Sequence, residues 1–303
     1  MMDRNRLRQS RHLLTHNKFK HTKPLIFASV VVICMVALAA RVFWSRAEAE
    51  HRASKIPVSV QAVISSPTTT TPNLDNFIST TKKVINANPN ITFEVSTIEL
   101  SNNNLEELGG TSPMVAASVT KIITAADFLN QVEIGNESLQ ENFDGNTTQY
   151  EIQQMIVISD DEAWERLNND LTYPQLQAYA GGLGISDYDA VNNTISATDI
   201  ARVLADLYEG KLLNQSNTNL LLSYLKEANY RQYIVPAVPA SDTVYHKIGL
   251  YNDNVNDAAI ITHNKQAFVL VIFTNGNGSY NWPNRAELMQ QIATAAISAY
   301  LGN

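Results

Sequence analysis

The most constraining feature of the sequence is an apolar stretch from Pro113 to Leu129 that contains one serine and one lysine. Ser118 and Lys121 are three residues apart, so on a helix they share one face. The residues around them are almost all apolar, which is typical of a helix buried on all sides. A lysine there is costly unless its amine has a partner or a task. The pair is therefore a candidate nucleophile with its own base.

The same spacing occurs twice elsewhere in the chain, and there it indicates surface helices. Ser79 and Lys82 lie in a polar segment, and Ser223 and Lys226 lie on the outer side of an amphipathic helix. We interpret both pairs as structural, because neither has an apolar setting. Burial, and the residues that follow further along the chain, distinguish Ser118 from them.

The N-terminal region is basic and then apolar. Residues 1–24 are rich in Arg and Lys, and residues 25–44 are apolar apart from Ser29 and Arg41. About 20 apolar residues span a bilayer. The pattern predicts a single-pass signal anchor at 25–44, with the leader in the cytoplasm and the rest of the chain outside the cell membrane. The alternative is a secreted protein with a cleaved signal peptide, because Ala37-Leu-Ala39 is similar to a cleavage site.

Beyond residue 44 the composition of the chain changes from apolar to polar. Residues 45–72 are polar and rich in serine, threonine and proline, which predicts a flexible spacer. Residues 73–303 are long enough for one sizeable domain. The formal net charge is −7 although the leader is basic, so this domain is acidic. An acidic domain argues against nucleic-acid binding.

The hydrophobic pattern of residues 73–303 predicts an α+β fold. Helices are expected at each end of the domain, over residues 73–87 and 283–301, and an all-helical subdomain is expected over about 131–235. Strands are expected at 91–100, in a short segment ending at 109–110, and at 243–250, 258–262 and 267–274. This order predicts a five-stranded antiparallel sheet built from both ends of the domain, packed by the terminal helices in an α/β sandwich.

Three short motifs occur in a fixed order within this domain: Ser118-Val-Thr-Lys121, Ser159-Asp-Asp161 and Lys247-Ile-Gly249. With them the chain resembles the class A β-lactamases and the penicillin-binding D,D-peptidases, whose motifs are Ser-x-x-Lys, Ser-Asp-Asn and Lys-Thr-Gly. The resemblance covers residues 75–302. It implies the β-lactamase and transpeptidase type of fold, in agreement with the predicted order of elements.

The resemblance also implies a role for each motif. Ser118 would attack a carbonyl carbon, and Lys121 would take its proton. Ser159 would relay a proton towards the leaving nitrogen, and Lys247 would attract a substrate carboxylate. The backbone N–H groups of Ser118 and Leu250 would form the oxyanion hole.

The chain departs from the family motifs at two positions. Asp161 stands where the family has asparagine, and a carboxylate cannot donate a hydrogen bond to a substrate carbonyl. If Asp161 paired with Lys121, it would also keep that lysine protonated. Ile248 replaces a hydroxyl residue, and Leu250 after the retained Gly249 offers none, which weakens carboxylate recognition.

A third departure concerns deacylation. Class A β-lactamases carry a glutamate that activates water, in a loop that corresponds here to the short segment between Gly184 and Ser196. No glutamate occurs between Asp170 and Glu209. Asp187 and Asp189 are the acids of that short segment, and we interpret them as solvated.

These observations predict a membrane-anchored serine hydrolase that forms an acyl-Ser118 intermediate on a β-lactam or on the D-Ala-D-Ala-type amide of a peptidoglycan stem peptide, with slow deacylation. The alternative, motivated by Asp161 and Ile248, is a non-catalytic relative that binds cell-wall peptide or a protein. We expect no cofactor and no metal, because Cys34 lies within the predicted anchor and the histidines outside the leader are scattered.

Overall fold

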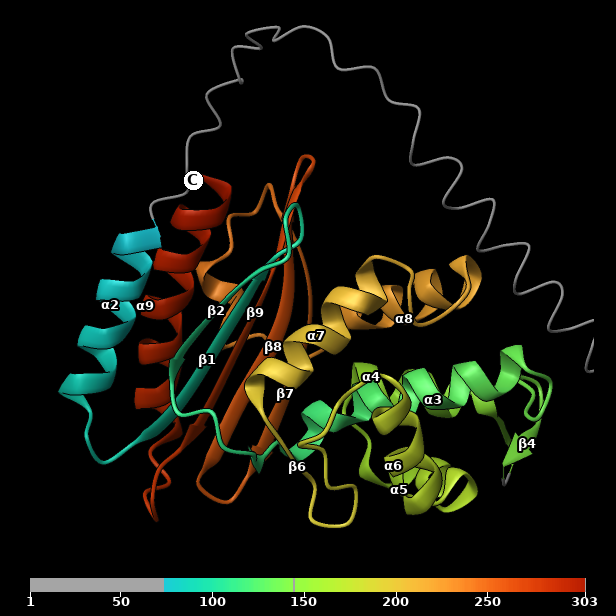
Figure 1. The fold of residues 1–303 in the computed structure, drawn as a ribbon. Coiled ribbons are helices and arrows are strands. Elements are labelled where there is room, and N and C mark those ends of the chain that lie inside the picture. The colour runs from blue at the N-terminus through green and yellow to red at the C-terminus, as the bar shows by residue number, and fades with distance from the viewer. Residues whose placement is uncertain (1–73, 144, 303) are drawn as a thin grey trace, which may run out of the picture. The chain divides into compact units, whose positions relative to one another are not determined.

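The structure, a computed structural model, describes residues 74–143 and 145–302, all of which belong to one compact unit (Figure 1). The predicted leader, anchor and spacer, residues 1–24, 25–44 and 45–72, lie outside the described residues. Within the described part of the chain, no helix has the length and the hydropathy of a membrane span.

The centre of the fold is a five-stranded antiparallel sheet, as the sequence predicted. Its strands are β1 (Thr92–Glu99), β2 (Asn104–Gly109), β7 (Thr243–Tyr251), β8 (Asn254–His263) and β9 (Gln266–Asn275). They are arranged in the order β2-β1-β9-β8-β7, so the two ends of the domain meet where β1 pairs with β9. Strand β7, which carries Lys247, lies at one edge of the sheet.

Strand β9 shows why this sheet is covered on both faces. Val271 and Phe273 belong to one hydrophobic cluster, whereas Leu270 and Ile272 between them belong to another. Because successive side chains of a strand point to opposite faces, an unbroken apolar run needs a layer of packing on each side. The absence of alternation in residues 269–273 therefore predicted the layered architecture correctly.

Two helices from opposite ends of the domain cover one face of the sheet (Figure 1). They are α2 (Leu74–Ala87) and α9 (Trp282–Leu301). The ring of Phe77 in α2 meets the edge of Tyr300 in α9, with 6.1 Å between the ring centroids. The Tyr300 hydroxyl also shares a buried 2.7 Å hydrogen bond with Thr97 of β1, which ties the helix layer to the sheet.

The other face carries the helical part of the domain, inserted between β2 and β7. It contains the helices η1 (Ala117–Thr120), α3 (Lys121–Glu133), α4 (Thr148–Val157), α5 (Asp161–Leu171), α6 (Tyr173–Gly182), α7 (Ala197–Tyr208) and α8 (Gln215–Glu227), and the short strands β3 (Met114–Val115), β4 (Asn142–Phe143), β5 (Asn146–Thr147) and β6 (Thr194–Ile195). The short helix η2 (Val235–Ala237), just before β7, packs instead with α9 on the first face. The helix predicted around Ser118 comes first, ahead of the helices expected over about 131–235.

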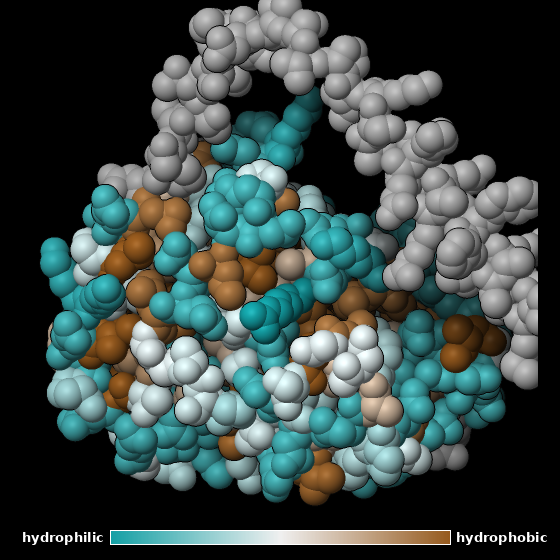
Figure 2. All heavy atoms as spheres, in the orientation of Figure 1, coloured by the Kyte–Doolittle hydropathy of each residue, from teal (hydrophilic) through white to brown (hydrophobic). Residues whose placement is uncertain are grey.

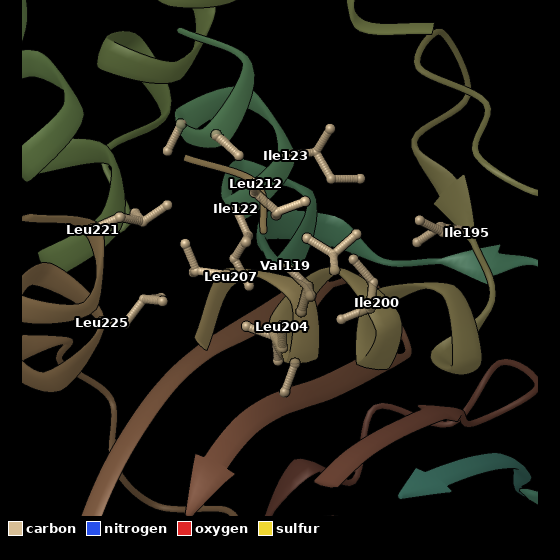
Figure 3. Close-up of a cluster of buried hydrophobic side chains, with 14 of the residues drawn as sticks. Val119, Ile122, Ile123, Ile195, Ile200, Leu204, Leu207, Leu212, Leu221 and Leu225 are labelled. Atoms are coloured by element: carbon tan, nitrogen blue, oxygen red, sulfur yellow. The ribbon is translucent and has the colours of Figure 1, made fainter. Parts of the chain in front are cut away.

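The buried stretch predicted around Ser118 is the centre of this helical part. Every residue of α3 from Lys121 to Leu129 is buried. Ile122 and Ile123 belong to one hydrophobic cluster with Leu204 and Leu207 of α7, and Figure 3 shows Ile122 beside Leu207. On the molecular face drawn in Figure 2, hydrophobic and hydrophilic residues are interspersed. The two large apolar clusters consist of buried residues, and one of them contains the buried apolar residues of α3.

Candidate active site

Ser118 is the second residue of η1, the turn that joins β3 to α3, and the backbone of this turn is strained. Ala117 has a φ of 52°, which is unusual for a residue with a side chain. Such a conformation costs about 1–3 kcal/mol and persists where its surroundings hold it in place. The Ser118 side chain is partly exposed and lines a cleft at the edge of the sheet.

Two asparagines that the motif analysis missed hold this turn. Asn256 of β8 donates a 2.9 Å hydrogen bond to the Val115 carbonyl and accepts one of 3.1 Å from the Thr274 N–H. Asn193 donates a 3.1 Å hydrogen bond from its amide to the Ala117 carbonyl. The turn is thus tied both to the sheet and to the loop before β6.

The Lys121 amine is fully buried and points to the residues of the second motif. It donates hydrogen bonds to the Ser159 carbonyl at 2.8 Å, the Ser159 hydroxyl at 3.4 Å and the Asp161 carboxylate at 2.5 Å. It also lies 5.1 Å from the centroid of the Trp164 ring. Burial lowers the pKa of Lys121, and the Asp161 carboxylate partly opposes that shift.

Ser159 brings the second and third motifs together. Its hydroxyl accepts a 2.8 Å hydrogen bond from the Lys247 amine in addition to the longer one from Lys121. The φ of Ser159 is 62°, a left-handed conformation in the connection between α4 and α5. Burial and the nearby charge of Lys121 lower the pKa of Lys247 to about 7. The structure therefore places two amines of reduced basicity around one hydroxyl.

The two aspartates after Ser159 have separate tasks. Asp160 caps α5, because its carboxylate accepts hydrogen bonds from the N–H groups of Glu162 and Ala163 at 2.9 and 3.0 Å. Asp161 is the first residue of α5 and forms an ion pair with Lys121. The structure thus contains the ion pair between Asp161 and Lys121 that favours the protonated form of the lysine.

Gly249 lets the edge strand β7 approach the nucleophile turn. A Cβ atom at this position would lie 2.1 Å from the Ala116 carbonyl oxygen and 3.1 Å from the Ser118 nitrogen. Both are backbone atoms, so a larger residue would push β7 away from Ser118. Leu250, the next residue, lines the cleft beside Ser118.

Ile248 and His246 lie on the face of β7 opposite Lys247. Ile248 is 4% exposed, packs in the hydrophobic cluster of α2 and α9, and lines the end of the cleft near Ser159. The buried His246 ring is 3.2 Å from an Asp257 oxygen. His246 therefore packs behind the site, where the side chains of this strand contact the α9 layer.

The cleft has two halves that meet at Ser118, Asp161 and Leu250. The first, the Tyr230 half, has a volume of about 240 Å³ and is also lined by Ile158, Ser159, Tyr230 and Ile248. The second, the Trp164 half, has a volume of about 400 Å³ and is also lined by Val115, Ala117, Trp164, Asn192, Asn193 and Tyr251. No sequence motif identifies the aromatic residues of the cleft, Trp164, Tyr230 and Tyr251, because they come from separate segments of the chain.

The loop before β6 supplies asparagines to the cleft but no carboxylate. Asp189 accepts hydrogen bonds from the N–H groups of Val191 and Asn192 and from the Asn192 amide, and these lower the pKa of Asp189. Asp187 does not line either half. Among the described residues that line the two halves, Asp161 is the only acid.

Comparisons with known proteins agree with this geometry. The family model described as "Beta-lactamase enzyme family" matches residues 76–300. The solved structure of PBP-A is similar with a TM-score of 0.70 at 20% identity, covering 76% of this chain and 97% of that chain. An ancestral class A β-lactamase is similar with a TM-score of 0.69 at 17% identity, covering 74% of this chain and 100% of that chain.

A third similar structure is a point mutant of PBP-A, described as an acyl-enzyme complex with penicillin G, with a TM-score of 0.69 at 20% identity over 76% of this chain and 98% of that chain. No curated protein matched the sequence. Because the family model spans well over half of the sequence, the chain belongs to the beta-lactamase enzyme family and is a serine hydrolase of that family. The fold and the family predicted from the three motifs are thereby confirmed.

Proposed function

We propose that this protein acts outside the membrane on a β-lactam or on a D-Ala-D-Ala-type amide of the cell wall, through an acyl-Ser118 intermediate. The observation that carries the proposal is the convergence of the Lys121 and Lys247 amines on the Ser159 hydroxyl, beside Ser118 in one cleft. The description of a PBP-A mutant as an acyl-enzyme with penicillin G supports the choice of substrate class.

The groups present account for each proton of the acylation step. As a bond forms between the Ser118 oxygen and the carbonyl carbon, the hydroxyl proton passes to neutral Lys121. When the carbon–nitrogen bond breaks, Ser159 gives its proton to the leaving nitrogen and takes one from an adjacent lysine. The N–H groups of Ser118 and Leu250 stabilise the negative charge on the carbonyl oxygen.

The test of the nucleophile is covalent labelling with a fluorescent penicillin and with an alkyl fluorophosphonate. We expect the label on Ser118 and its complete loss in Ser118→Ala, while Ser79→Ala and Ser223→Ala keep it. The fluorophosphonate is included because it needs no carboxylate site. A peptide map that places the label on another residue would contradict the assignment, and a folded protein that takes neither label would favour the non-catalytic binding relative.

Deacylation is proposed to be slow. A water that cleaves the acyl ester needs a base, and the only carboxylate among the described residues that line the cleft is Asp161, which is paired with Lys121. Lys121 has just accepted a proton, and the leaving group of a β-lactam stays tethered in the site. A missing general base typically costs about 10²–10⁴-fold in rate.

A time course of penicillin hydrolysis measures this directly. We expect a burst in which about one β-lactam ring is opened per enzyme, because each Ser118 acylates once and keeps the opened molecule bound, followed by little steady turnover. Intact-protein mass spectrometry should show the acyl-enzyme persisting after the burst. Steady-state hydrolysis as fast as acylation would show instead that Asp161 or another acid serves as the base.

We also propose that residues 25–44 anchor the protein in the membrane with the catalytic domain outside. The support is the apolar run itself and the basic leader before it. The full-length protein should remain in the membrane fraction after high-salt washing, and externally added protease should release the domain. Recovery of a soluble form that begins near residue 40 would show that a signal peptide is cleaved.

A further inference from the structure

Asp161 has a carboxylate that helix α5 does not need for its N-terminal cap. The cap of α5 is supplied by Asp160, so the side chain of Asp161 is not required at the helix terminus. The Asp161 side chain is 84% exposed, whereas its partner Lys121 is fully buried. An exposed carboxylate at the start of a helix is available to a ligand as well as to Lys121.

The position of Asp161 puts it against any molecule that reacts with Ser118. It lines both halves of the cleft, and the halves meet at Ser118. Within the described residues, the Lys121 amine donates the only hydrogen bond that this carboxylate accepts. An ionised carboxylate has about four acceptor positions. Asp161 therefore has acceptor capacity left for a group on the substrate.

Each nitrogen-bearing side chain of the Trp164 half donates one hydrogen bond within the protein, and the two asparagine amides each have a second N–H group besides. The Trp164 ring N–H donates to Thr124, the Asn192 amide donates to Asp189 and the Asn193 amide donates to Ala117. A substrate carbonyl oxygen placed beside Asp161 would thus face the lone pairs of a carboxylate. A substrate N–H group placed there would have a charged acceptor.

We propose that the substrate carries a free, positively charged amino group next to the scissile carbonyl, and that Asp161 binds this group. Among the amides and esters that acylate Ser118, those of an amino acid with an unblocked amine would then react faster than N-acylated ones, which include penicillins and the D-Ala-D-Ala end of a stem peptide. This proposal rests on the acyl-serine function proposed above. It also gives the Trp164 half a role, since that half would accommodate the substituent beside the amino group.

Because Asp161 also pairs with Lys121, binding of a substrate amino group to Asp161 would change the pKa of that lysine. An ammonium group that binds Asp161 competes with Lys121 for the same carboxylate. The Asp161 contact is the main influence that raises the pKa of Lys121 against the effect of burial. Substrate binding would therefore favour the neutral form of the amine that must accept the Ser118 proton, so the substrate would promote its own acylation.

The test compares alanine p-nitroanilide with its N-acetyl derivative, each in both D and L forms, on wild type, Asp161→Asn and Asp160→Asn. The readout is the ratio of kcat/KM for the free amine to kcat/KM for the acetylated compound, in which effects of a substitution that are common to both substrates cancel. We expect the wild type to favour the free amine roughly tenfold or more, since a charge-assisted hydrogen bond is lost otherwise. Asp161→Asn should lose that preference.

Asp160→Asn is the matched control, because it removes the same charge one residue away while asparagine still caps the helix. It should keep the wild-type ratio. A second readout needs no turnover: protection of Ser118 from fluorophosphonate by alaninamide and by N-acetylalaninamide. A labelled Ser118 with no selective protection by the free amine, or a preference that Asp161→Asn retains, would overturn the substrate assignment alone. An unlabelled Ser118 would overturn the acyl-serine function and this assignment with it.

Discussion

The burial of the Lys121 amine is the constraint on which the arrangement of the site depends. A charged amine in an apolar core is unstable unless neighbouring groups accept its protons. Here the connection between α4 and α5 supplies them, through the Ser159 carbonyl and the Asp161 carboxylate. The same contacts fix the Ser159 hydroxyl beside Lys247, so satisfying one buried lysine also brings the second and third motifs together.

Two opposing influences then set the chemistry of this lysine. Burial favours the neutral amine that a base requires, and Asp161 favours the protonated amine. With an uncharged amide at position 161, burial would lower the pKa of Lys121 with less opposition from a neighbouring charge. The amide would also offer an N–H donor to a substrate carbonyl. The aspartate therefore changes both the basicity of Lys121 and the kind of group that the cleft can bind, and both changes follow from one oxygen atom in place of an amide nitrogen.

Much of this could be predicted from the sequence because it depends on local patterns. The unbroken apolar run of residues 269–273 indicated a sheet covered on both faces, and the order of the three motifs indicated the family. The roles of Asn193, Asn256 and Tyr230 could not be predicted, because each depends on contacts between distant segments. Gly249 was recognised as part of a motif, but its steric reason, the close approach to the Ala116 carbonyl, needed the structure.

The most direct test of this account is the pH dependence of Ser118 acylation by an alkyl fluorophosphonate, measured for wild type and for Asp161→Asn. Acylation requires a neutral Lys121, so its rate should rise with pH through the pKa of that lysine. Removing the Asp161 charge lowers this pKa, and the midpoint should move to lower pH in the variant. An unchanged midpoint, or a shift to higher pH, would show that the ion pair does not control the base.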